Sequence, residues 1–218
     1  MSATALRPAG FVLVGALSAG VTGVVVGTAA GSLSGNRMAP WIVGRAAGLS
    51  AYALLVALVL LGLLLSHPWR SRWRRPSSAT RIRVHVVLAV LVLALTVLHV
   101  VVLATDRFAG VGWWGAALPM RASYRPVPVT LGVVGAWAGL LAGVTAALAG
   151  HLPARAWWPI HKVAAVALVL AWLHGALAGG DTYALRWIYV GTGLIVAVVA
   201  LSRYAARTAG EQVEVLHR

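Results

Sequence analysis

The sequence contains no cysteine and very few acidic residues. Its 218 residues include four Asp and Glu and no Cys, against 18 Lys and Arg. The lack of Cys excludes disulfides, thiolate metal sites, iron–sulfur clusters and cysteine nucleophiles. Charged residues make up 10% of the chain, well below the roughly 25% of an average soluble domain. The composition therefore excludes an ordinary soluble globular protein.

Long apolar runs take the place of the missing charge. Hydrophobic residues make up 61% of the chain, and several runs are long enough to cross the ~30 Å hydrocarbon core of a bilayer. We predict an all-α integral membrane protein, a single domain that is a bundle of six transmembrane helices. The expected spans are residues 11–33, 41–66, 84–105, 129–150, 158–179 and 184–204. The first is longer than the apolar region of a usual signal peptide, so we expect it to be retained.

The basic residues predict how the chain crosses the membrane, because cytoplasmic loops are enriched in Lys and Arg. The loop after the second span carries a cluster of six: Arg70, Arg72, Arg74, Arg75, Arg81 and Arg83. With this loop in the cytoplasm, both termini are cytoplasmic and twelve of the eighteen Lys and Arg lie on that side. We expect a multi-pass protein of a bacterial plasma (inner) membrane. Topology also explains the net charge of +14 better than nucleic-acid binding does.

Two glycine ridges repeat every fourth residue. One lies at the end of the first span and the other in the fourth span: Gly23, Gly27, Gly31 and Gly35, then Gly135, Gly139 and Gly143. Such ridges let helix backbones approach closely. The favoured interpretation is packing inside this bundle, and the alternative is an oligomer or partner interface.

Four histidines lie inside predicted spans, where ionisable side chains are rare and usually functional. His85 and His99 are in the third span, and His161 and His174 are in the fifth. The predicted topology makes these two spans parallel. The two histidines are fourteen residues apart in the third span and thirteen apart in the fifth, which correspond to rises of roughly 21 Å and 19.5 Å along the helices. We therefore expect His85 to share a level with His161 near the cytoplasmic face, and His99 to share one with His174 near the opposite face.

The directions of the four side chains match less well than their depths. A spacing of fourteen residues is close to four helical turns, so His85 and His99 point the same way. The spacing of thirteen between His161 and His174 leaves them out of line on an ideal helix. A bend, a tilt, or two ligands rotated relative to each other would each absorb the difference.

The available ligands favour haem. The predicted spans contain no Asp, Glu or Cys, whereas zinc, manganese and non-haem iron usually take a carboxylate or thiolate. Two imidazoles at each level, in an apolar slot, suit two b-type haems with both axial positions filled. Such haems carry electrons, and we assign no catalytic residue. The alternative is that these histidines only hydrogen-bond between helices, as single intramembrane histidines often do.

Haem propionates need cations or hydrogen-bond donors near the membrane surfaces. The cytoplasmic candidates are Arg81, Arg83 and Lys162, and those on the other side are Arg45, Arg121, Arg125 and Arg186. Arg45 is the preferred residue because it sits just inside the second span. Topology alone also explains each of these cations.

The histidine pattern resembles the ferric reductase-like transmembrane domain. This superfamily includes the NADPH oxidases, the ferric reductases and the haem-binding membrane subunit of the bacterial methionine sulfoxide reductase system. The resemblance covers the second to sixth spans. It rests on His85-x13-His99, on His161-x12-His174 within Trp157-Trp158-Pro159-Ile160-His161-Lys162, and more weakly on Gly44-Arg45-Ala46-Ala47-Gly48. It implies an inner haem at His85 and His161, an outer haem at His99 and His174, and electron flow from a cytoplasmic flavin outward.

The chain departs from that family in having only about fourteen residues after the last predicted span. We therefore expect no soluble flavin- or nucleotide-binding domain, so that a separate flavin reductase or a quinol supplies electrons to an extracytoplasmic acceptor. The chain would then be the electron-transfer subunit of an oxidoreductase. Two other functions stay open. One is a haem-free transporter or assembly subunit, and the other is a quinol- or ascorbate-linked cytochrome b.

Overall fold

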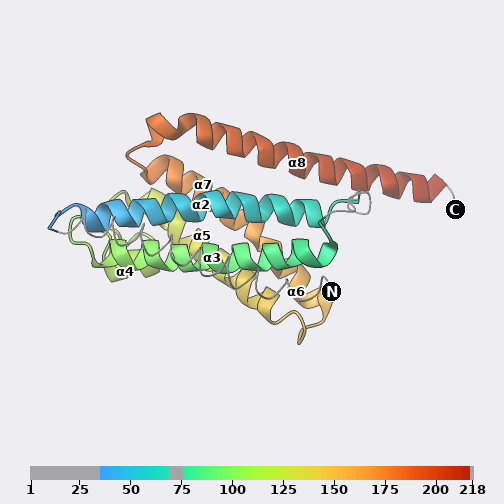
Figure 1. The fold of residues 1–218 in the computed structure, drawn as a ribbon, viewed down its shortest axis with the longest axis horizontal. Coiled ribbons are helices and arrows are strands. Elements are labelled where there is room, and N and C mark those ends of the chain that lie inside the picture. The colour runs from blue at the N-terminus through green and yellow to red at the C-terminus, as the bar shows by residue number, and fades with distance from the viewer. Residues whose placement is uncertain (1–34, 69–75, 217–218) are drawn as a thin grey trace, which may run out of the picture. The chain divides into compact units, whose positions relative to one another are not determined.

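The computed structural model describes residues 35–68 and 76–216, with side chains to residue 206, and this part of the chain contains helices and no strand. The helices are α2 (Ala39–Leu65), α3 (Ser78–Thr105), α4 (Gly112–Ala117), α5 (Pro126–Ala147), α6 (Ala154–His161), α7 (Val163–Ala178) and α8 (Thr182–Leu216) (Figure 1). The chain divides into two units, Met1–Ala39 and Pro40–Arg218. The second unit holds the helical bundle.

Five segments of the described chain are long and apolar enough to cross a membrane: Ala39–Leu65, Ser78–Thr105, Pro126–Ala147, Ala154–Ala178 and Thr182–Ala206. The prediction of an all-helical, multi-pass integral membrane protein is confirmed at this level. The predicted first span lies outside the described residues, as do Arg70, Arg72, Arg74 and Arg75. The six-span count and the sides of the termini stay predictions.

The outer surface of the bundle is apolar. On α3, for example, Val86, Val87, Val90 and Val97 each leave more than half of their surface exposed. In water such a face would be costly, whereas in a bilayer it contacts lipid tails that are as apolar as the side chains. The bundle therefore buries little of its apolar surface internally and is built for a lipid environment.

Helix ends follow local chemistry more closely than the apolar pattern does. α3 begins at Ser78, earlier than the expected residue 84, because the Ser77 hydroxyl caps it by accepting the Thr80 backbone N–H at 3.2 Å. This cap carries two arginines, Arg81 and Arg83, into the first turns of the helix. Near the C-terminus of the chain, α8 continues to Leu216, beyond the end predicted for the sixth span at residue 204.

Helices α2 and α3 pack antiparallel, and so do α5 and α7. Figure 1 shows α2 and α3 running side by side. The start of α2 meets the end of α3, where a Cβ at Gly44 would come 2.7 Å from Leu103. A Cβ at Gly62, near the end of α2, would instead face His85 near the start of α3. Helix α8 joins α2 through the hydroxyls of Tyr52 and Thr192, 2.5 Å apart.

The second glycine ridge packs inside the bundle. A Cβ on Gly135 would lie 3.2 Å from the Leu170 Cβ and 3.5 Å from the Ala167 carbonyl oxygen, both on α7. Gly143 faces Leu93 of α3 instead. This ridge therefore serves the close approach of α5 to its neighbours, which is the favoured interpretation. In the first ridge, Gly23, Gly27 and Gly31 lie outside the described residues.

The predicted fifth span consists of two helices. α6 ends at His161, α7 begins at Val163, and Lys162 between them interrupts the helix. Pro159 lies inside α6 and has no backbone N–H to donate to the preceding turn, which loosens the helix at this point. The break falls between the two histidines of this span.

The close contact of α5 with α7 gives a first prediction. Gly135→Ala should lower the free energy of unfolding by about 1–3 kcal/mol, because its new methyl group is forced against the Leu170 Cβ and the α7 backbone. Gly191→Ala is the matched control, because nothing lies within 4 Å of its added Cβ. Thermal unfolding in detergent measures both. Equal midpoints for the two variants would contradict the packing described here.

Candidate functional site

The four intramembrane histidines form two pairs of equal spacing. The ring centres of His85 and His161 are 6.2 Å apart, and those of His99 and His174 are also 6.2 Å apart. The ring planes are inclined by 65° in the first pair and 79° in the second. Each pair takes one ring from α3 and one from the α6–α7 segment, so these two segments run parallel.

In the second pair, both rings are held by a backbone carbonyl on the neighbouring antiparallel helix. The Nδ1 of His99 lies 2.7 Å from the Gly44 carbonyl oxygen of α2, and the Nδ1 of His174 lies 2.8 Å from the Pro128 carbonyl oxygen of α5. A carbonyl oxygen only accepts, so Nδ1 must carry the proton. The Nε2 of each ring then keeps its lone pair and is free to bind a metal.

In the first pair, the corresponding contacts are weaker. The Nδ1 of His161 lies 3.3 Å from the Ala142 carbonyl oxygen of α5. The Nδ1 of His85 is buried and meets no acceptor in normal hydrogen-bond geometry among the described residues, although the Leu58 carbonyl of α2 acts on it as a weak hydrogen-bond acceptor. The two pairs therefore share a layout but differ in the strength of their anchors.

The carbonyls that face the histidines are fourteen residues apart on both α2 and α5, which is the spacing of His85 and His99 and one residue more than that of His161 and His174. On α2 the carbonyls are those of Gly44 and Leu58, fourteen residues apart, and they face His99 and His85. On α5 they are those of Pro128 and Ala142, also fourteen apart, and they face His174 and His161. Helix α2 thus presents a backbone carbonyl to α3 at both histidine levels, and α5 does the same for the α6–α7 segment.

Three of these carbonyls are followed, one helical turn later, by a glycine that leaves space for the histidine ring. A Cβ at Gly48 would come 2.6 Å from the His99 ring, one at Gly132 would come 2.7 Å from the His174 ring, and one at Gly62 would come 3.3 Å from the His85 ring. Sequence reasoning missed these glycines because it looked for ridges with a period of four. The signal was present, since Gly48 and Gly62 repeat the fourteen-residue spacing of His85 and His99.

A helix break lies between the two histidines that are thirteen residues apart. His161 is the last residue of α6, and His174 lies inside α7. Lys162 between them keeps helical dihedral angles, so the departure from one regular helix is confined to this residue. The sequence left open a bend, a tilt or two rotated ligands, and the break at Lys162 favours the bend.

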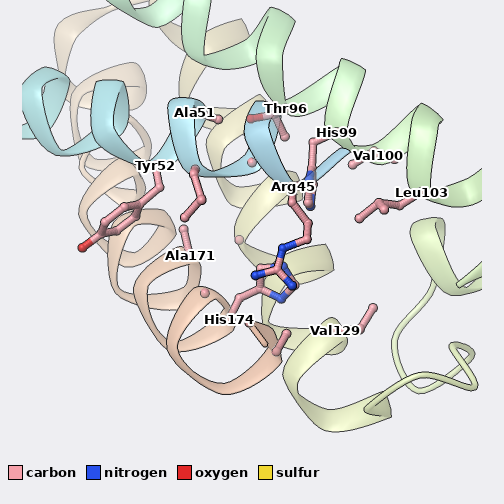
Figure 2. Close-up of a pocket in the computed structure, with 18 of the residues that line it drawn as sticks. Arg45, Ala51, Tyr52, Thr96, His99, Val100, Leu103, Val129, Ala171 and His174 are labelled. Carbon is pink, nitrogen blue, oxygen red and sulfur yellow. The ribbon is translucent and has the colours of Figure 1, made fainter. Parts of the chain in front are cut away.

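A cavity of about 240 Å³ extends from the His99–His174 pair toward the middle of the bundle. Figure 2 shows His99 of α3 and His174 of α7 directed into it together with Arg45 of α2, and Tyr52 of α2 also lines it. Small residues from α2, α5 and α7 make up much of its wall: Gly48, Ala51, Gly132, Gly135, Ala136, Gly139, Ala167, Ala171, Gly175, Ala178 and Gly179. Such a wall leaves room for a broad, flat apolar group beside the two imidazoles.

Arg45 lines this cavity, as a propionate contact would have to, but it already has an acidic partner. Its guanidinium forms an ion pair with Asp181, the residue before α8, and also lies 5.5 Å from the centre of the Trp41 ring. Sequence reasoning missed Asp181 because it lies in a loop between spans. Arg125, another candidate on this side, donates to the Leu177 carbonyl at 2.7 Å, close to His174 along α7.

Of the other basic residues predicted as propionate contacts, only some lie near a histidine pair. Arg81 is buried one turn before His85 and donates to Ser78 Oγ at 3.0 Å. Lys162 directly follows His161 and lies over the Trp158 ring, whereas Arg186 lies over Tyr183. Arg83 and Arg121 are exposed. Arg81 and Lys162 are therefore the cations nearest along the chain to the first pair.

The spacing of each pair matches what two imidazoles on one metal require. An imidazole nitrogen binds a metal at about 2.0–2.1 Å, and the ring centre lies about 1.1 Å behind it, so two rings on opposite sides of one metal have centres about 6.2–6.4 Å apart. Within the described residues, no three His, Cys, Asp or Glu come together as a metal cluster. The ring separation of each pair thus has the length that two imidazoles on opposite sides of one metal would need.

The glycines behind the rings yield a prediction on packing. Gly132→Ala should lower the free energy of unfolding by about 1–3 kcal/mol and weaken the His174–Pro128 contact, because its Cβ would overlap the imidazole. Gly139→Ala, on the same helix, adds a Cβ at an ordinary 4.0 Å from Ala167 and serves as the control. Thermal unfolding compares the two. A Gly132→Ala protein as stable as the control would show that the His174 ring does not sit against Gly132.

Comparison with known protein families, with curated proteins and with solved structures finds no match to this chain. The two histidine pairs are therefore the evidence on which a function rests.

Proposed function

We propose that this protein transfers electrons across a membrane through two b-type haems, each held by one histidine pair. The observation that carries the proposal is the pair of equal ring separations, 6.2 Å at both levels, between parallel segments of the bundle. A haem iron held by two imidazoles exchanges single electrons and has no open position for a substrate.

The residues around each pair prepare the imidazoles for this role. The Gly44, Pro128 and Ala142 carbonyls accept from Nδ1, which leaves the Nε2 lone pair available to a metal. A second-shell carbonyl of this kind is a common companion of a metal-bound histidine. The fourth of these ring nitrogens is the Nδ1 of His85, which is also buried.

The site supports the resemblance to the ferric reductase-like superfamily, and the finer features of that resemblance enter the proposal with it. They are a six-helix bundle with cytoplasmic termini, location in a bacterial inner membrane, an inner haem at His85 and His161, and an outer haem at His99 and His174. A separate flavin reductase or a quinol donates electrons on the inner side, and an extracytoplasmic acceptor receives them. Arg45 lines the cavity at the outer pair and is our candidate for the outer propionates.

A second candidate is a haem-free protein in which the histidines only link helices. The Nδ1 contacts to α2 and α5 favour it, because they are interhelical hydrogen bonds in their own right. This candidate gives no reason for each histidine ring to lie beside another imidazole. Nor does it require the same ring separation at two levels.

The experiment is an absorption spectrum of the protein purified from haem-replete cells. We expect a reduced-minus-oxidised spectrum of b type with two haems per chain. His85→Ala or His161→Ala should remove one haem, and His99→Ala or His174→Ala the other, because a single imidazole holds the iron poorly. His151→Ala, in an exposed turn, should keep both. A colourless preparation would contradict the proposal and favour the haem-free alternative.

A further inference from the structure

The two histidine pairs differ in how strongly the protein polarises their rings. At His99 and His174 the Nδ1-to-carbonyl distances are 2.7 and 2.8 Å, both short for an N–H···O bond. At His161 the distance is 3.3 Å, and at His85 the Leu58 carbonyl acts only as a weak acceptor outside normal bonding geometry. One pair therefore has two strong anchors, and the other has two weak ones.

The local sequence accounts for part of the difference. Gly48 and Gly132 lie one turn beyond the Gly44 and Pro128 carbonyls and leave space for the ring to reach them. The residue one turn beyond the Ala142 carbonyl is Ala146 and not a glycine. At His99 and His174 the strong anchors thus depend on the glycines behind the rings, and they can be altered by substitution.

A hydrogen bond from Nδ1 changes what the opposite nitrogen does to a metal. When a carbonyl accepts the Nδ1 proton, negative charge shifts onto the ring and Nε2 becomes a stronger electron donor. A stronger donor stabilises the more positive, oxidised state of the metal. Second-shell hydrogen bonding is one of the means by which proteins set haem potentials.

The nearby charges act in the same direction. Arg81 and Lys162 lie one turn and one residue from the first pair, while Arg45 and Arg125 lie near the second. At the second site, Asp181 pairs with Arg45. Partial neutralisation of Arg45 leaves the second site less positive, and this again favours an oxidised metal there.

We propose, building on the haem function above, that the two sites have unequal reduction potentials, with the lower one at His99 and His174. Gly48 and Asp181 are positioning residues that maintain the difference. Gly48 does so by giving His99 access to the Gly44 carbonyl, and Asp181 by neutralising Arg45. Neither residue is a ligand of the metal.

A redox titration of the purified full-length protein, followed by its absorption bands, tests the order. The wild-type protein should titrate in two steps. His99→Ala or His174→Ala should remove the lower step, and His85→Ala or His161→Ala the higher. Coincident steps, or loss of the lower step in the His85→Ala protein, would overturn this inference and leave the proposed function intact. A preparation without haem would overturn both.

Two further variants test the same inference if a histidine variant does not fold. Gly48→Ala pushes the His99 ring away from the Gly44 carbonyl, and Asp181→Asn restores the full charge of Arg45. Each should raise the lower potential and leave the higher one in place. Gly193→Ala, whose added Cβ would lie 3.7 Å from Trp172, is the control and should move neither. A lower step that stays fixed in both test variants would contradict the roles of these residues.

Discussion

The hydrogen bond between a histidine Nδ1 and a carbonyl on the next helix is the interaction on which this bundle's candidate site depends. A polar ring inside a bilayer finds no water and must be satisfied by protein. A helical carbonyl already bonded within its own helix still has a second lone pair to offer. At Gly44 and Pro128 the chain uses that lone pair, at 2.7 and 2.8 Å. The bonds set the register of α3 against α2 and of α7 against α5.

This constraint makes the glycines behind the rings more than packing residues. A helix surface covered by Cβ atoms keeps an imidazole away from the backbone, whereas Gly48 and Gly132 open a path to the carbonyl one turn earlier. The same small residues form part of the cavity wall. Close helix contact, ring orientation and space for a flat ligand therefore depend on the same positions, and a larger residue there would disturb all three.

Much of this arrangement could be predicted from the sequence, because a membrane restricts the chain to long apolar helices with regular rise. Both ends of α2 and the C-terminal end of α7 lie within about two residues of the predicted ones. Depth alone matched His85 with His161 and His99 with His174. The helix break at Lys162 could not be derived, because Pro159 in a membrane helix is also compatible with a kink or a straight course. Asp181 was missed because its partner Arg45 is distant in sequence, and only the fold brings α2 against the start of α8.

The unequal anchoring of the two pairs bears on the direction of electron flow. In the proposed orientation, a lower potential at His99 and His174 opposes the outward step between the pairs. An energised bacterial membrane is negative inside, and it drives negative charge outward by about 2.3 kcal/mol per 100 mV for a full crossing. The two pairs are about 21 Å apart along the helices, a large part of the ~30 Å hydrocarbon core, so most of that energy acts on this step. Under the proposed function, the carbonyl anchors and the membrane voltage would therefore act in opposite senses on the same electron, and a resting electron would stay on the inner pair until the membrane is energised or an acceptor draws it out.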